Sequence, residues 1–215
     1  WWWDDQTGVR KYVTNVCEYL PFAVLAGGIW DGMVVMGYNS DHYFYQNLWF
    51  AVLNRGVKMP PIAELDGGYG RHNKFPYGRY RTYYHVGDNN NIDGVADAVR
   101  KGRTFVTSGP IVLANIDEKF ETGQNVPADG ESRSLNIEAW ASGAHNDFLS
   151  YLVVFRNGEI LKLWNYLEEK PRHVRETLEI KEDERSWYVI KAYGRARQPV
   201  ESLLDVPLVC DMIAQ

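Results

Sequence analysis

The segment Leu135-Asn136-Ile137-Glu138-Ala139-Trp140-Ala141 decides the fold class of the second half of the chain. Its small and hydrophobic residues alternate with polar or exposed ones, which is the period of a strand with one buried face. The same alternation recurs in residues 151–155 and 187–193, and Asn157-Gly158 is a dipeptide favoured in type I′ hairpin turns. Several short strands with turns between them predict an immunoglobulin-like β-sandwich over residues 104–215.

The first half of the chain has a different pattern, in which helical periods separate short apolar runs. Residues 9–20, 44–52 and 92–99 carry hydrophobic side chains at helical spacing, and Asn91 is placed to cap the last helix with Ile92, Val95 and Val99 turned inward. Strands are expected at 22–26, 33–38, 60–66 and 80–86. The predicted fold class is therefore α+β and multidomain, with an α/β part in residues 1–103 and the β-sandwich in 104–215.

Composition and charge restrict the classes of partner. The 215 residues carry 28 acidic and 23 basic side chains, a net charge of −5, which argues against a general nucleic-acid binder. The longest apolar stretch, residues 21–30, is about half the roughly 20 residues that a membrane-spanning helix needs. Neither nucleic acid nor a membrane is therefore an expected partner. The expected partner is a small-molecule substrate, which follows from the resemblance described below.

The end of the strand predicted at 60–66 is a candidate site. Asp66 closes that apolar run and opens a glycine-rich loop, a position suited to a metal ligand or to a group that holds a catalytic base. Four basic residues near it in the sequence could bind a phosphate or carboxylate group: Arg71, His72, Arg79 and Arg81. A solvated loop is the alternative interpretation. No two histidines have an H-x-H or H-E-x-x-H spacing, so a self-contained zinc site is not expected.

Several ordered segments resemble a known enzyme group. The segments are Trp30-Asp31-Gly32-Met33 through His42, Leu48 through Gly56, Pro60-Pro61 through Asp66, Gly78 through Tyr84, and Ala98 through Gly109-Pro110 with its Gly-Arg-Thr-Phe-Val-Thr-Ser-Gly-Pro run. Together they resemble the metallohydrolases of the carbaryl-hydrolase and McbA-like type in the PHP (polymerase and histidinol phosphatase) superfamily. The resemblance spans about residues 22–110.

The resemblance implies a distorted α/β barrel with divalent metals at its strand ends, of which residues 1–103 would be the C-terminal part. It implies hydrolysis of phosphoester, carbamate or amide-type bonds with zinc, manganese or iron. Asp66 matches a family metal ligand, whereas Gly68 stands where a histidine often follows, and the other ligands would precede Trp1. The metal site in this chain is therefore expected to be incomplete, and the isolated chain inactive. The likeness favours a secreted or periplasmic setting, and the compartment stays open.

Two other functions remain open from the sequence. A degenerate, non-catalytic PHP-like member could serve as a scaffold, with Gly68 marking lost metal binding. A carbohydrate-binding or adhesive sandwich could instead use an exposed row of Trp140, Trp164 and Trp187. Because the α/β part has too few strands for a barrel of its own, the chain is expected to be a fragment whose open barrel face meets an N-terminal segment or a second chain.

Overall fold

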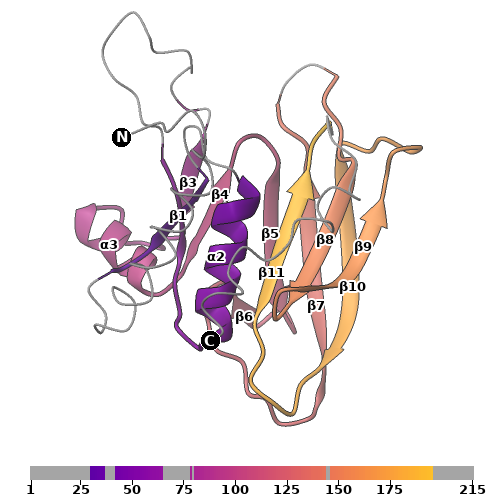
Figure 1. Ribbon diagram of the computed structural model, residues 1–215. Helices are drawn as coiled ribbons and strands as arrows, with labels where there is room; N and C mark the ends of the chain where they lie inside the picture. The colour runs from indigo at the N-terminus through magenta and orange to yellow at the C-terminus, as the bar shows by residue number, and fades with distance from the viewer. Residues whose placement is uncertain (1–29, 37–41, 65–77, 79, 144–145, 196–215) are drawn as a thin grey trace, which may run out of the picture.

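The structure, a computed structural model, describes residues 30–36, 42–64, 78, 80–143 and 146–195. Most of its regular structure is β, with two helices among the described residues (Figure 1). The elements in chain order are β1 (Met33–Met36), α2 (His42–Asn54), β2 (Pro61–Ala63), β3 (Arg81–Tyr84), α3 (Ile92–Arg100), β4 (Thr104–Thr107), β5 (Ile111–Ile116), β6 (Phe120–Glu121), β7 (Ser132–Trp140), β8 (Tyr151–Arg156), β9 (Glu159–Asn165), β10 (His173–Lys181) and β11 (Tyr188–Tyr193). The helix predicted at 9–20 and the strand at 22–26 lie outside the described residues.

Two antiparallel sheets form the larger part of the described chain. One has the strand order β10-β7-β5-β6 and the other β11-β8-β9. Leu135, Ile137 and Ala139 of β7 pack in one buried cluster with Leu152 and Val154 of β8, so the sheets face each other across a shared core. This arrangement is sandwich-like, and it confirms the period-2 prediction for β7.

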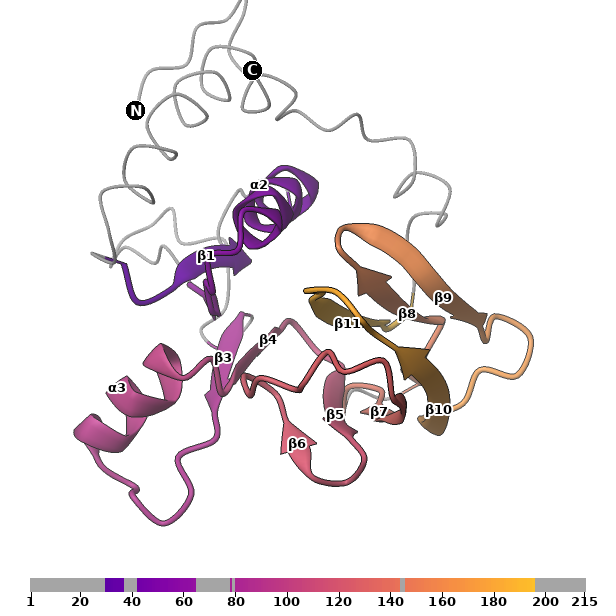
Figure 2. The same ribbon diagram turned by 90° about the horizontal axis from the view of Figure 1, so that it is seen from below.

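The second sheet is covered on its other face by α2, which makes a third layer (Figure 2). Alternate residues of β8, Tyr151, Val153 and Phe155, join a cluster with Phe50 of α2. Leu152 and Val154 face the sandwich core, so β8 is buried on both sides. The predicted alternation in residues 187–193 is confirmed in the same way: Tyr188, Ile190 and Ala192 contact the sandwich core, whereas Trp187, Val189 and Tyr193 contact the α2 cluster.

The elements before β5 form two small sheets that lie next to each other. β1 and β2 are parallel, with Met33 opposite Pro61, and α2 connects them. β3 and β4 are antiparallel, with Tyr83 opposite Phe105. The Thr82 hydroxyl oxygen accepts a hydrogen bond from the Ala63 backbone N–H at 2.8 Å, which ties β3 to β2. Strands are thus present within the predicted ranges 33–38, 60–66 and 80–86, of which residues 37–38 and 65–66 lie outside the described part of the chain.

The helix α3 lies on the other side of β3 and β4 from the sandwich (Figures 1 and 2). Asn91 caps it as predicted, because its side-chain oxygen accepts from the Gly94 N–H at 2.9 Å. The prediction that Ile92 turns inward is wrong, since Ile92 is 81% exposed. The buried positions are Gly94 and Ala98, and Ile92 lies about 200° around the helix from Gly94.

Backbone angles confirm the hairpin turn predicted at Asn157-Gly158 and show two glycine helix ends. Gly56 after α2 has φ +82° and Gly102 after α3 has φ +71°, both in the left-handed region that favours glycine. Asn157 and Gly158 have φ +53° and +96°, and they join β8 to β9 as a hairpin.

The predicted division between residues 103 and 104 falls at the start of β4. This strand pairs with β3, which belongs to the predicted first part. The α2 cluster also contains residues from both parts, with Phe50 on one side and Phe155 on the other. The two parts therefore contact each other through a strand pair and a buried cluster, and their division into domains stays a prediction.

Candidate functional site

The predicted metal site begins with the β1-α2-β2 unit, in which a helix connects two parallel strands. Met33, Leu48, Val52 and Met59 form a buried cluster that holds α2 against the strands. The Trp49 indole N–H also donates to the Met59 carbonyl oxygen at 2.6 Å. In α/β folds, side chains at the carboxyl ends of such strands form binding and catalytic sites. The carboxyl end of β2 at Ala63 is followed three residues later by Asp66.

Most of the residues predicted for this site lie outside the described residues: Asp66, Arg71, His72 and Arg79. Arg81 is described, and it begins β3 with an exposed side chain. Its guanidinium carbon lies 6.0 Å from the centre of the Tyr83 ring. Because the neighbouring Thr82 is hydrogen bonded to Ala63, Arg81 starts a strand that borders the end of β2.

Within the described part of the chain, no group of three or more histidine, cysteine, aspartate or glutamate side chains could hold a metal ion. The predicted ligand Asp66 is not among these residues. The metal site therefore stays a prediction.

A groove of about 720 Å³ lies between the β3-β4 pair and the outer face of the larger sheet. We call it the strand groove. Five strands, β3, β4, β5, β7 and β10, line it. Their lining residues include Tyr83, Phe105, Leu113, Asn115, Asn136, Glu138, Arg175 and Thr177. On β5, β7 and β10, these residues alternate with those that fill the sandwich core. The period of the strands therefore produces the polar outer face.

The floor of the strand groove consists of cross-strand rows. Asn115, Asn136 and Thr177 are aligned across β5, β7 and β10. The Asn136 amide donates to the Asn115 side-chain oxygen at 3.2 Å, and the Thr177 hydroxyl donates to the Asn136 side-chain oxygen at 3.1 Å. These bonds fix the orientation of both amide groups, which is a property of sites that bind polar ligands.

The next row places Leu113 opposite Glu138 and Glu138 opposite Arg175. The Glu138 carboxylate accepts from the Arg175 Nε at 2.8 Å and lies 2.7 Å from the His173 Nε2. Burial acts to raise the pKa of Glu138, but the hydrogen bonds from His173 and Arg175 outweigh it and lower the pKa below its ordinary value. Glu138 is therefore an ionised acceptor at neutral pH.

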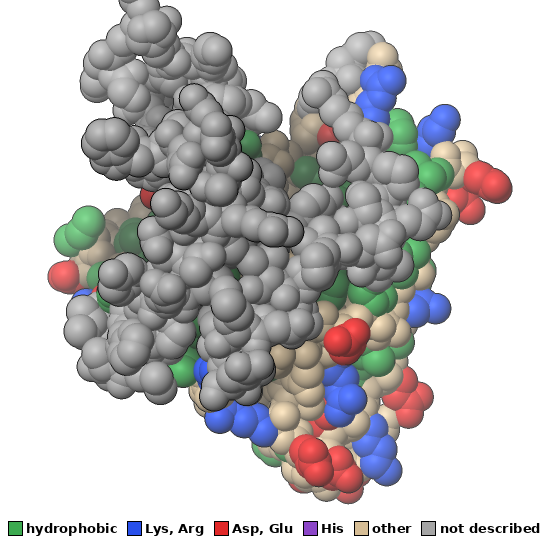
Figure 3. Space-filling model, viewed as in Figure 1, with side chains coloured by type: hydrophobic (Ala, Val, Ile, Leu, Met, Phe, Trp, Pro, Cys, Tyr) green, Lys and Arg blue, Asp and Glu red, His purple; other side chains and the backbone are tan. Residues whose placement is uncertain are grey.

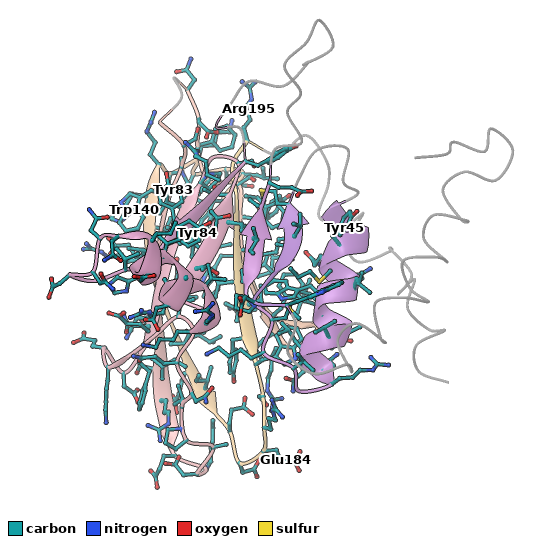
Figure 4. All side chains as sticks on the ribbon, turned by 90° about the vertical axis from the view of Figure 1, so that its left-hand side faces the viewer. Tyr45, Tyr83, Tyr84, Trp140, Glu184 and Arg195 are labelled. Atoms are coloured by element: carbon teal, nitrogen blue, oxygen red, sulfur yellow. The ribbon has the colours of Figure 1, made fainter. Side chains whose placement is uncertain are left out.

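Aromatic rings form one wall of the strand groove. Tyr83 and Phe105 are stacked, with ring centroids 4.8 Å apart and an angle of 1° between their planes. Tyr83 is 38% exposed and Leu113 on the floor is 51% exposed. Figure 4 shows Tyr83, Tyr84 and Trp140 on one side of the molecule, with Tyr45 of α2 on the other. The groove therefore combines two aromatic side chains on one wall with a polar floor.

The strand groove carries more acidic than basic groups. Its acidic lining residues are Glu118, Glu121 and Glu138, and its arginines are Arg103 and Arg175. The Glu176 carboxylate instead accepts from the Tyr166 hydroxyl on the sandwich-core side of β10. Both arginines have carboxylate partners: Arg103 contacts Asp97 at 2.6 Å and Arg175 contacts Glu138. His85 likewise lies 2.9 Å from Glu121. The described surface seen in Figure 3 has basic and acidic side chains interspersed over the sandwich.

The row of tryptophans considered from the sequence does not form. Trp140 is on β7 and stacks on His173, with ring centroids 5.1 Å apart. Trp164 packs against the sandwich core, and Trp187 packs against Phe50 in the α2 cluster. These three rings therefore lie in different environments and form no common row.

One basic side chain lies between β11 and α2. The Lys191 ammonium donates to the side-chain oxygen of Gln46, and its nitrogen lies 5.3 Å from the Tyr193 ring centre. Burial lowers the pKa of Lys191 to about 8. Lys191 contacts α2, whereas the strand groove lies on the outer face of the other sheet. The lowered pKa of Lys191 therefore affects the stability of the fold.

Comparison with known proteins identifies no relative. No family model, no curated protein and no solved structure matches the chain. Function must therefore be argued from the residues.

Among the described residues, neither helix has the length and apolar character required to cross a membrane.

Proposed function

We propose that this chain is the C-terminal portion of a PHP-like metal-dependent hydrolase that acts on a small molecule with a phosphoester, carbamate or amide-type bond. The observation that carries the proposal is the parallel β1-α2-β2 unit, whose second strand leads to Asp66. A strand-helix-strand unit with a carboxylate just beyond its second strand is what a partial α/β barrel with a strand-end metal site requires. The sandwich-like sheets that follow agree with the domain order implied by the resemblance.

In this proposal the residues have separate roles. Asp66 would supply one ligand to a zinc, manganese or iron ion, and the proposal requires further ligands from residues before Trp1. When bound, such an ion lowers the pKa of a water molecule and polarises the substrate. Arg71, His72, Arg79 and Arg81 orient the anionic or carbonyl group of the substrate. Arg81 has support from the structure, because its strand borders the end of β2.

The test uses the intact gene product, whose mass and divalent-metal content are measured on one sample. We expect a heavier protein with stoichiometric metal, and hydrolysis of an aryl phosphate or an aryl carbamate. Asp66→Asn should lower both the metal content and the rate. Asp183→Asn, at an exposed residue near β11, is the matched control and should change neither.

Metal content that is unchanged in Asp66→Asn would refute the ligand assignment. An intact protein without metal and without hydrolase activity would favour the degenerate PHP-like scaffold, because one carboxylate alone does not fix a catalytic ion.

A further inference from the structure

We propose that the strand groove is a binding site for a neutral saccharide chain. This site is separate from the predicted metal site and does not depend on it. It is built from residues of β3, β4, β5, β7 and β10, all of which are described. Its volume of about 720 Å³ lies in the range of about 300 to 1,000 Å³ that is typical of small-ligand sites.

The aromatic wall supplies the surface that a sugar ring needs. A pyranose has faces covered by C–H groups, and the negatively polarised face of an aromatic ring attracts them. Tyr83 and Phe105 both line the groove, and because they stack on each other they offer a sugar ring their edges and the faces that they do not turn to each other. Leu113, which is 51% exposed on the floor, adds an apolar contact below it.

The floor supplies polar partners for the hydroxyl groups at the edge of the sugar. The amides of Asn115 and Asn136 are held by cross-strand hydrogen bonds, so they are oriented before a ligand arrives. Amides offer both donors and acceptors, and the ionised Glu138 accepts from hydroxyl groups. Planar side chains of this kind can form paired hydrogen bonds with neighbouring sugar hydroxyls.

The charges of the groove favour a neutral ligand over an anionic one. Three glutamates line it against two arginines, and those arginines already contact carboxylates. A phosphate or a uronic acid would therefore be repelled without gaining a free cationic partner.

The geometry also disfavours an organic cation. Recognition of an ammonium group uses several ring faces turned toward one point, whereas Tyr83 and Phe105 stack on each other. A neutral sugar is the ligand class that these features fit together.

Binding of the full chain to six hexasaccharides tests the proposal, with EDTA present to exclude a metal contribution. The neutral probes are cellohexaose, xylohexaose, mannohexaose and maltohexaose; the charged probes are hexagalacturonate and chitosan hexamer. We expect at least one neutral probe to bind with a Kd below about 1 mM, and neither charged probe to bind as tightly. Absence of binding by all four neutral probes, or tighter binding of a charged one, would overturn the proposal.

Two variants locate the site. Leu113→Lys places a long side chain on the groove floor and should weaken binding at least about tenfold, because it displaces the ligand. Tyr83→Ala should do the same by removing one of the two aromatic side chains of the wall. Leu161→Lys is the matched control: Leu161 is 44% exposed on β9, in the other sheet, and its substitution should leave binding unchanged. Folding of each variant is checked by circular dichroism, and a folded Leu113→Lys that binds normally would exclude the groove as the site.

Discussion

Phe50 of α2 and Trp187, just before β11, pack with their ring centroids 4.9 Å apart. The contact joins a helix in the first half of the chain to the second sheet. Phe50 also lies 5.3 Å from Phe155 of β8, and the Trp187 indole N–H donates to the Asn54 side-chain oxygen at 2.8 Å. Through these contacts α2 shares one buried hydrophobic cluster with β8 and β11.

Substitution of Phe50 measures how strongly α2 stabilises this sheet. Phe50 is 3% exposed, so Phe50→Ala leaves a cavity and should lower the free energy of unfolding by about 3 to 5 kcal/mol. Urea unfolding followed by tryptophan fluorescence gives the value. Leu161→Ala, at an exposed leucine, should change it by less than about 0.5 kcal/mol. A loss below about 1 kcal/mol for Phe50→Ala would mean that α2 contributes little.

Lys191 should make stability depend on pH in the alkaline range. Its pKa is about 8 in the folded protein against an ordinary value of 10.5. Between these values the unfolded chain binds the extra proton, so the free energy of unfolding rises as pH increases from 8 to 10.5. The penalty below pH 8 is at most about 3 kcal/mol.

Lys191→Met removes that penalty but also removes the partner of Gln46, which costs about 1 kcal/mol. We expect the free energy of unfolding of Lys191→Met to be higher by about 1 to 2 kcal/mol at pH 7. Above pH 8 it should rise less with pH than that of the unsubstituted protein. Urea unfolding at pH 7, 8.5 and 10 measures both. Equal pH profiles for the two proteins would show that Lys191 is not desolvated.

Asp147 should contribute to stability against acid. Its carboxylate accepts hydrogen bonds from the backbone N–H groups of Phe148, Ser142 and Arg195 at 3.0 to 3.2 Å. Burial acts to raise the pKa of Asp147, but the hydrogen bonds from the Ser142 side chain and these N–H groups lower it below the ordinary 3.8. This stability is present above pH 3.8 and is lost as pH falls through the folded pKa.

Asp147→Asn should lower the free energy of unfolding by about 1 to 3 kcal/mol at pH 7, because a charged acceptor is lost. The difference from the unsubstituted protein should shrink at pH 3. Thermal unfolding at both values measures it, with Asp183→Asn as the exposed control. A difference that is the same at both pH values would assign the effect to packing and not to charge.

Thr82→Val tests the connection between the two small sheets. The Thr82 hydroxyl accepts from the Ala63 N–H and donates to the Ala63 carbonyl oxygen at 3.2 Å. Valine keeps the shape and removes both bonds, so stability should fall by about 1 to 2 kcal/mol. Thr122→Val, at an exposed position, is the control and should be neutral. No loss in Thr82→Val would indicate that water replaces the hydroxyl.

The strands were the part of the fold that the sequence predicted best. In a strand with one buried face every second residue is hydrophobic, as in Leu135, Ile137 and Ala139. The burial of α3 was harder to predict. Its large apolar residues are Ile92, Val95 and Val99, but the buried positions are those of the small residues Gly94 and Ala98. A side-chain carbon on Gly94 would lie 1.8 Å from the Asn89 carbonyl oxygen, so the loop that leads into the helix passes too close for any residue but glycine.

The strand groove could not be predicted from local pattern. Asn136 and Glu138 have the positions of solvated strand residues, and their sequence neighbours give no sign of a ligand. Only the pairing of β7 with β5 and β10, together with the approach of β3 and β4, brings them near Tyr83. Long-range pairing of this kind depends on the whole fold, whereas the predicted role of Asp66 depends on one strand end.

The double burial of β8 has a consequence for motion. Leu152, Val153 and Val154 are completely buried, with the sandwich core on one side and the α2 cluster on the other. Opening their amides to solvent requires both layers to separate, so amide hydrogen exchange in β8 should be the slowest of the second sheet and should report global unfolding. The edge strand β9 should exchange sooner, through local openings that leave its neighbour closed.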